Sequence, residues 1–248
     1  MVSAWVDAGR AHAIMGNHEF ESLAWTLRDK RGQRLLDRTP ETRAKMAQFL
    51  KVRKKDPMAY RRHLDFFGRL PLWLDMGEFR CVHACWDDKS IDYLEKKLGP
   101  EARVRKKDIR KAFTDGHKMQ RATQTILSGP RLSLPKKARR NIARRTGKLR
   151  TEARMRWWAE DEADMARLAM LRDATPRTLK GRSPKSRIAY TDDVPVFFGH
   201  YHLRQAPFIT APNAACLDFG AGSGRRLVAY RWSGESRLTP DKLVDVKV

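Results

Sequence analysis

The sequence predicts an α/β fold, and three stretches carry this prediction. Residues 11–15, 81–85 and 197–202 include short apolar runs, and each run contains or leads into histidine. Helical patterns lie between them, as in sheets connected by helices. Because ligands bind where the strands of such sheets end, we expect the three histidine-containing tips to come together. The 248 residues and a hydrophobic content of 41% are compatible with one large packed domain.

Helix-forming patterns are recognisable by apolar spacing and by start and stop signals. Gly9 is suited to end the first helix, and residues 39–42 combine a threonine cap, a proline in the first helical position and an acid in the first turn. We expect helices over residues 2–8, 20–28, 35–55, 57–64, 90–98 and 152–171.

Strand patterns alternate with these helices. Residues 76–78 predict a hairpin turn, and the glycine-rich residues 220–224 predict a turn within a final antiparallel meander. We expect strands over residues 11–15, 70–74, 79–83, 194–198, 214–219 and 227–232. The helix over 2–8 has no strand before it, although a crossover helix follows a strand. The chain is therefore expected to begin in the middle of a supersecondary unit.

A basic stretch interrupts the pattern of core elements. Residues 101–186 are expected to form a mostly helical insertion, followed at its end by a polar loop over 176–186. Between Arg131 and Arg156, eleven Lys or Arg residues stand against one acid, Glu152. This run is either a solvated face or an anion-binding surface. Trp157 and Trp158 either stack on bases or pack a helix onto the core, and we favour packing.

Charge and composition limit the partners and the compartment. The net charge of +23 favours phosphorylated anionic substrates. It also favours binding of nucleic acid or nucleotides by the basic insertion. No apolar run approaches the ~20 residues that span a bilayer, so we expect no membrane partner. The N-terminus lacks a signal pattern, and three cysteines indicate no disulfide framework. These features predict a cytoplasmic protein.

Four side chains at the expected strand ends are candidate metal ligands. They are Asn17, His83, His200 and His202. Imidazole nitrogens and an amide oxygen suit a divalent ion such as Mn, Fe, Zn or Ni. Cys81 and Cys85 flank His83 at two-residue spacing, which permits a zinc site on one strand face. We favour buried strand cysteines over that site.

Three motifs, in this order, resemble signature blocks of one enzyme family. Gly-Asn-His-Glu at 16–19, Val-His-Ala at 82–84 and Gly-His-x-His at 199–202 are similar to three of the five blocks of calcineurin-like metallophosphoesterases. The closer likeness is to the bacterial branch with Ser/Thr protein phosphatases and symmetrical diadenosine tetraphosphatases. The resemblance covers most of the chain outside the basic insertion. It implies an αββα sandwich of two mixed β-sheets flanked by helices, formed by a single domain over 1–248.

The resemblance also implies roles for individual residues. Asn17, His83 and His200 resemble ligands of the second of two divalent metal ions, and His202 resembles a ligand of the first. His18 resembles the catalytic histidine that contacts the phosphate and assists protonation of the leaving group. The implied reaction is hydrolysis of phosphate esters or anhydrides, of phosphoprotein or dinucleoside polyphosphate type, by a metal-bound hydroxide.

The sequence departs from the family in its first part. The blocks Gly-Asp-x-His-Gly and Gly-Asp-x-x-Asp-Arg-Gly do not occur. In the family they supply the other ligands of the first metal, the bridging aspartate and a phosphate-binding arginine. We therefore expect a domain without its N-terminal βαβ unit, with mainly one half of the metal site and impaired activity. The alternative function is a non-catalytic basic module that binds nucleic acid or phosphoprotein on an inactive phosphatase scaffold.

Overall fold

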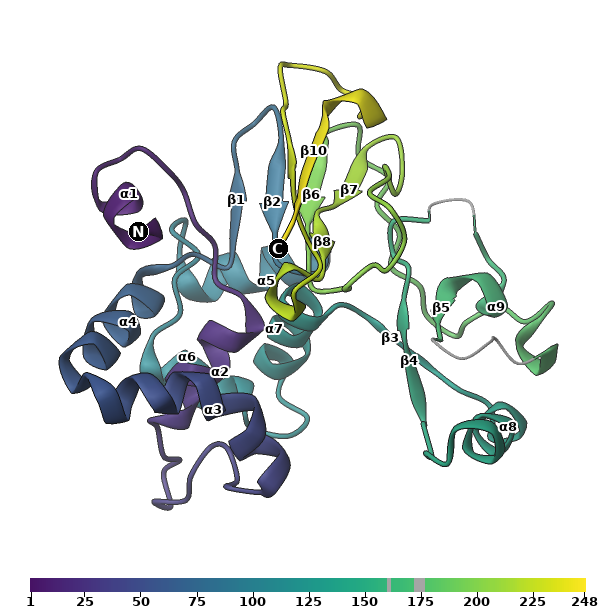
Figure 1. Cartoon of the computed structure of the whole chain (residues 1–248). Coiled ribbons are helices and arrows are strands. Elements are labelled where there is room, and N and C mark those ends of the chain that lie inside the picture. The colour runs from purple at the N-terminus through teal and green to yellow at the C-terminus, as the bar shows by residue number, and fades with distance from the viewer. Residues whose placement is uncertain (160–161, 172–176) are drawn as a thin grey trace. The chain divides into compact units, whose positions relative to one another are not determined.

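The structure is a computed structural model that describes residues 1–159, 162–171 and 177–248 (Figure 1). It divides into two compact units. Unit 1 comprises Met1–Asp75, Cys81–His83 and Asp88–Leu127, and unit 2 comprises Met76–Arg80, Ala84–Asp87 and Ser128–Val248. Helices and strands occur together, which confirms the predicted α/β class.

Unit 1 is mainly helical. Its two short strands are β1 (Trp73–Asp75) and most of β2 (Arg80–Val82). Its helices are α1 (Val2–Asp7), α2 (Asn17–Trp25), α3 (Pro40–Lys55), α4 (Pro57–Arg69), α5 (Asp88–Leu98), α6 (Lys106–Ala112) and α7 (Lys118–Ser128, whose last residue falls in unit 2). The predicted helices over 2–8, 35–55, 57–64 and 90–98 are thus confirmed with shifted ends.

The starts of α3 and α4 follow directly from sequence. The Thr42 backbone N–H donates to Thr39 Oγ1 at 3.2 Å, and the Ala59 N–H donates to Asp56 Oδ1 at 2.8 Å. Each cap satisfies one of the otherwise unpaired donors in the first turn. The two helices pack through Phe49 and Tyr60, whose ring centroids are 4.6 Å apart.

The predicted strand over 11–15 is wrong. These residues form no described strand, and Met15 makes a single backbone hydrogen bond, from its N–H to the Pro71 carbonyl oxygen at 2.7 Å. One bond of this kind makes no ladder, so the segment is a connection that leads into α2. That helix begins at Asn17, three residues before the predicted start at Phe20.

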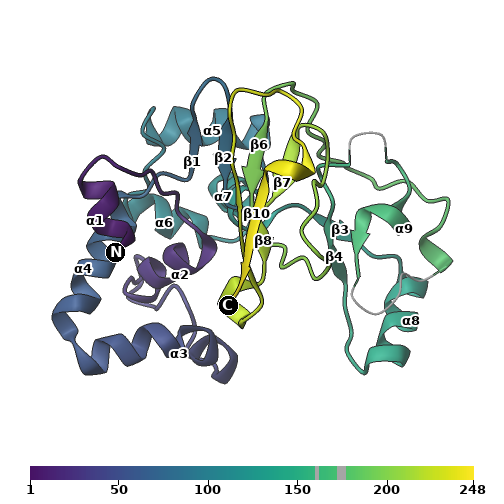
Figure 2. The ribbon, with the colours of Figure 1, turned by 45° about the horizontal axis from the view of Figure 1, so that its top comes forward.

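Unit 2 contains most of the strands. An antiparallel sheet has the order β3-β4-β5, from β3 (Arg131–Ser133), β4 (Glu152–Met155) and β5 (Ala169–Met170). A second has the order β10-β9-β8, from β8 (Asp218–Phe219), β9 (Arg226–Tyr230) and β10 (Leu243–Lys247). Strands β9 and β10 pair antiparallel, with Leu243 opposite Tyr230; β10 is the labelled yellow strand in Figures 1 and 2.

Strands β6 (Val196–Phe198) and β7 (Ala214–Cys216) pair in parallel, with Val196 opposite Ala214. The antiparallel meander predicted here is therefore wrong for this pair, although β8 and β9 are antiparallel as expected. The remaining elements of unit 2 are α8 (Lys136–Thr146), α9 (Met165–Leu168), η1 (Arg177–Leu179), η2 (Ala221–Ser223) and η3 (Pro240–Lys242).

The predicted helix over 152–171 is also wrong. Its ends form β4 and β5, and only α9 between them is helical; residues 160–161 lie outside the described residues. Ala153 and Met155 are buried at two-residue spacing, and β4 pairs with β3 through residues 152–154. Pairing with a distant strand has overridden the local preference of Glu, Ala, Arg and Met for helix.

An aromatic cluster forms the core beside β6. Trp157 is fully buried, and its ring centroid lies 4.7 Å from that of Phe198. Trp158 lies 5.0 Å from Phe198 and 4.8 Å from Tyr201. The Trp157 Nε1–H donates to the Ala84 carbonyl oxygen at 2.8 Å, as a buried indole requires. Both tryptophans therefore pack the core, as predicted, and neither presents a face for stacking on bases.

Tyr201 depends on one glycine. Gly129 has φ +73°, and a Cβ built on it would lie 2.1 Å from the Tyr201 hydroxyl oxygen. Within the described residues this buried hydroxyl has no hydrogen-bond partner, and burial raises the pKa of Tyr201 well above its ordinary value. The hydroxyl therefore occupies space that only a glycine leaves open.

Gly129→Ala is expected to lower the free energy of unfolding by about 3 kcal/mol, from the left-handed backbone and the steric overlap together. Gly147→Ala is the matched control, because Gly147 has φ +67° and open space around it, so about 1 kcal/mol is expected there. Tyr201→Phe should restore part of the loss in Gly129→Ala. Urea unfolding of Gly129→Ala, Gly147→Ala, Tyr201→Phe and the double variant Gly129→Ala/Tyr201→Phe measures these differences. Equal losses of unfolding free energy in the two glycine variants would contradict the overlap.

Candidate metal centre

Three of the predicted site residues lie in unit 1, two of them at the start of α2. Gly16 is the cap, Asn17 is the first helical residue, and the Gly16 N–H donates to Glu19 Oε2 at 3.1 Å. Asn17 Oδ1 lies 2.9 Å from His83 Nε2. Since an amide oxygen only accepts, the Nε2–H of His83 is the donor. Two of the predicted ligand residues are thus in direct contact.

Gly16 lets His83 approach closely. His83 directly follows β2, and a Cβ at Gly16 would lie 2.9 Å from its Cε1 atom, 3.0 Å from Nδ1 and 2.6 Å from Glu19 Oε2. The imidazole and the carboxylate therefore both lie against the bare Cα of Gly16. The backbone of Gly16 has φ −94°, which any residue can adopt. Glycine is therefore required here because it has no side chain, and not because of its backbone conformation.

The contact between Asn17 and His83 fits a shared ion. Adjacent ligand atoms of an octahedral ion bound at about 2.1 Å lie about 3.0 Å apart, close to the 2.9 Å observed. Oxygen and imidazole donors suit Mn, Fe or Zn. Ligation by Nε2 requires the neutral tautomer with its proton on Nδ1, so an ion would replace the present hydrogen bond.

His18 is placed differently from its two neighbours. Its imidazole is exposed, and its carbonyl oxygen accepts a hydrogen bond from Ser22 Oγ at 2.7 Å inside α2. The side chain is therefore held on the solvent side of the first helical turn. That position suits a group that meets a substrate better than one that is buried with a metal.

The other predicted ligands lie in a strained loop after β6, in unit 2. His200 has φ +72° and His202 has φ +50°. Among the described residues, the only other non-glycine residue with positive φ is Ala102. The Arg154 guanidinium donates to the His200 carbonyl oxygen at 2.9 Å and holds this backbone in place. Strain of this kind is concentrated at functional sites in proteins.

Asp218 fixes the second histidine of this loop. Its Oδ2 atom accepts from the His202 backbone N–H at 3.1 Å and lies 3.7 Å from His202 Nε2. Its Oδ1 atom accepts from the Gly220 N–H at 3.0 Å. Sequence reasoning gave Asp218 no role. The available signal was its place two residues beyond β7, at the same edge of a parallel pair as His200.

The predicted site residues fall into two groups. Asn17, His18 and His83 belong to unit 1, whereas His200 and His202 belong to unit 2. Over residues 1–159, 162–171 and 177–248, no group of three or more His, Cys, Asp and Glu side chains is arranged to hold a metal ion. The assignment of Asn17, His83, His200 and His202 as metal ligands therefore stays a prediction.

The cysteines are free and two are buried. Burial raises the pKa of the Cys81 thiol to about 11 and that of Cys216 to about 12. Zinc binding needs thiolates, which burial disfavours here. The raised pKa therefore argues against Cys81 as a zinc ligand. The expectation of two buried strand cysteines is met only in part, since Cys81 lies in β2 but is half-buried, and Cys85 is buried but lies beyond the strand.

No protein-family model matches this chain, and no curated protein matches it at a significant level. Within the described residues, no helix combines the length and the apolar character needed to cross a membrane.

Gly16→Ala is expected to displace His83 or Glu19 and to lower the free energy of unfolding by about 1–3 kcal/mol, because the new Cβ overlaps both side chains. The signal of the His83 ring in an NMR spectrum should shift with it. Gly68→Ala is the control within the same unit: Gly68 lies in α4 with open space around it, and alanine there should stabilise by up to about 1 kcal/mol. A neutral Gly16→Ala variant with an unchanged His83 signal would contradict the close approach.

Proposed function

We propose that this protein is a metal-dependent phosphoesterase with a calcineurin-like fold. One observation carries the proposal: Asn17 Oδ1 and His83 Nε2, predicted to bind the same ion, lie 2.9 Å apart although 66 residues separate them in sequence. The strained backbone of His200 and His202 supports it independently, since a structural loop has no need of two non-glycine residues in the left-handed region.

In this proposal, each predicted site residue has a role in metal binding or catalysis. Asn17, His83 and His200 would hold one divalent ion, and His202 would belong to a second. Bound Mn, Fe, Zn or Ni would supply Lewis acidity and a hydroxide nucleophile at neutral pH. The exposed His18 would contact the phosphate and protonate the leaving group. Asp218 would orient His202 through its backbone N–H and its ring.

The substrate class follows from charge. A net charge of +23 attracts anions over several ångströms, which favours a phosphoprotein or a dinucleoside polyphosphate as substrate. The free cysteines fit a reducing compartment, and we place the reaction in the cytoplasm.

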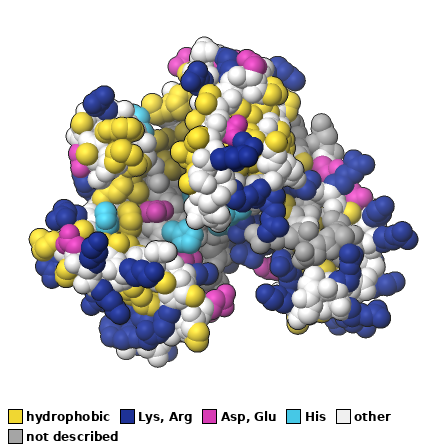
Figure 3. All heavy atoms as spheres, in the orientation of Figure 1, with side chains coloured by type: hydrophobic (Ala, Val, Ile, Leu, Met, Phe, Trp, Pro, Cys, Tyr) yellow, Lys and Arg dark blue, Asp and Glu magenta, His cyan; other side chains and the backbone are white. Residues whose placement is uncertain are grey.

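The alternative function, a non-catalytic binding module, is favoured by one observation in α8. This helix buries only Ala138 and Ile142, while Arg140, Arg144 and Arg145 are exposed. Figure 3 shows Lys and Arg side chains gathered over α8, at the lower right of the view. Such a surface binds nucleic acid through its phosphates without any need for a metal.

For the hydrolase, His83→Ala and His200→Ala are each expected to weaken Mn²⁺ binding by at least about tenfold, because each removes an imidazole ligand. The low rate of aryl phosphate hydrolysis in Mn²⁺ that we expect of a chain lacking two of the family's motif blocks should fall below detection in both. Calorimetry and a colorimetric assay measure the two effects. His12→Ala is the matched control, because His12 is an exposed histidine outside all three motifs. Full metal binding in either ligand variant, or equal loss in the control, would refute the assignment.

For the binding module, replacing Arg140, Arg144 and Arg145 with Gln should weaken binding of a single-stranded oligonucleotide. It should also reduce the slope of log affinity against log salt by about 2, since about 0.7 counterions are released per phosphate contact on single strands. The control replaces the exposed Lys51, Lys54 and Lys55 of α3 with Gln, which removes the same charge elsewhere. Equal slopes in the two triple variants would argue against α8 as the contact surface.

A further inference from the structure

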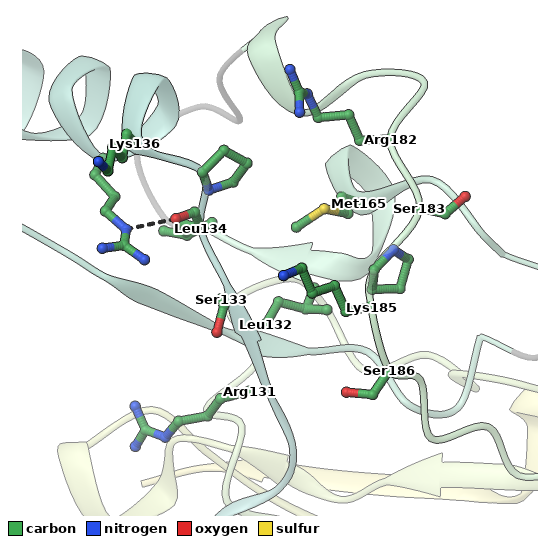
Figure 4. A pocket seen from close by; sticks show the side chains of 13 residues that line it. Arg131, Leu132, Ser133, Leu134, Lys136, Met165, Arg182, Ser183, Lys185 and Ser186 are labelled. Atoms are coloured by element: carbon green, nitrogen blue, oxygen red, sulfur yellow. Dashed lines mark hydrogen bonds between the residues drawn. The ribbon is translucent and has the colours of Figure 1, made fainter.

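Unit 2 contains a cavity of about 640 Å³ that the metal site does not use. One wall is formed by β3 and the start of α8, and the other by Met165 and residues 182–186 (Figure 4). Its volume lies within the range of roughly 300–1,000 Å³ typical of sites for small ligands. The lining residues are Arg131, Leu132, Ser133, Leu134, Pro135, Lys136, Arg139, Met165, Arg182, Ser183, Pro184, Lys185 and Ser186.

All the charged side chains that line this cavity are positive. Five lining residues are Lys or Arg, and none of the lining residues is acidic. Arg139 is used structurally, since its Nε donates to the Leu134 carbonyl oxygen at 2.6 Å. Arg131 lies 4.0 Å from the Glu152 carboxylate, at the limit of an ion pair. An anion in the cavity would relieve the repulsion among these like charges.

Three of the five cations remain available to a ligand. Lys136, Arg182 and Lys185 are exposed, and their side chains form no hydrogen bond or ion pair with the residues that the structure describes. They come from both walls of the cavity, and in Figure 4 Lys185 extends from its loop toward the wall formed by β3. The charged ends of Lys136 and Arg182 lie apart from that of Lys185 in Figure 4, and because all three side chains are exposed they can turn toward one bound molecule.

The floor of the cavity is apolar. Leu132, Leu134 and Met165 line the cavity but are each at most 5% exposed, so the apolar surface open to a ligand comes mainly from the half-buried Pro135 and Pro184. Ser133, Ser183 and Ser186 add hydroxyl groups at the rim. A merely solvated basic face needs neither a concave surface nor an apolar floor. The combination suits a ligand with a flat apolar part and a strongly charged part.

We propose that this cavity binds a small organic polyphosphate of the nucleoside triphosphate class. The phosphates contact Lys136, Arg182 and Lys185, and the base lies against Pro135 and Pro184, the half-buried apolar residues of the lining. The inference is independent of the proposed hydrolase, because none of the predicted metal or catalytic residues lines the cavity.

The test is calorimetric titration of the full chain in EDTA, so that metal-dependent binding does not contribute. The probes are ATP, inorganic tripolyphosphate and adenosine. ATP should bind more tightly than tripolyphosphate, and adenosine should not bind measurably. Replacing Lys136, Arg182 and Lys185 with Gln should weaken ATP binding by about tenfold or more. The matched control replaces Arg231, Arg237 and Lys247 with Gln; these exposed residues carry the same charge on the same unit but do not line the cavity, so binding should change by less than about twofold.

A second variant keeps the test decisive if the first folds poorly. Ser133→Asp adds a negative charge at an exposed position of the cavity wall and should also weaken ATP binding. Equal weakening by the cavity and control triples would show that the general field binds the ligand, and would overturn the site. Equal affinity for tripolyphosphate and ATP would overturn the nucleotide class. Absence of ATP binding by the unaltered chain would overturn the proposal altogether.

Discussion

The close approach of the His83 ring to the Cα of Gly16 constrains the rest of the candidate site in unit 1. With a Cβ at Gly16, the ring and the Glu19 carboxylate could not both keep their places. The carboxylate in turn accepts the Gly16 N–H at the start of α2. The same helical start places Asn17 against His83 Nε2 and leaves His18 toward solvent. One missing side chain thus determines where three functional groups lie.

Unit 2 reaches a comparable result by a different physical means. Its loop after β6 places His200 and His202 in a backbone conformation that non-glycine residues rarely adopt. Arg154 and Asp218 stabilise this conformation through hydrogen bonds to the backbone. The cost of the left-handed conformation, of order 1 kcal/mol or more per residue, is thereby offset by charged groups at fixed positions.

What the sequence could predict depended on the range of the interactions involved. The starts of α3 and α4 follow from Thr39 and Asp56, whose side chains cap the helices three residues away. The strand expected over 11–15 failed because strand formation depends on a distant partner. The parallel pairing of β6 and β7 was missed for a related reason: residues 199–213 between them are long enough for a crossover, so the meander was not required.

The candidate site shows the same contrast between features that local sequence predicts and features that depend on distant contacts. The motifs located Asn17, His83, His200 and His202 at the ends of elements, because apolar runs and the polar tips that follow them are visible locally. Asp218 was assigned no role, since its contact with His202 spans 16 residues of sequence. The basic run was recognised, but the cavity formed by Arg131 and Arg182 required the tertiary structure.

Tyr201 sits between the two strained histidines, yet its own side chain is buried against Trp158 and Phe198. Residues 200–202 therefore belong both to the aromatic core, through Tyr201, and to the strained loop, through the two histidines. A substitution that loosens the aromatic cluster would transmit its effect to the adjacent imidazoles without touching either one. In an alanine scan of this protein, losses of activity at Trp158 or Phe198 would imitate the loss of a catalytic group. Only a parallel measurement of folding would distinguish the two.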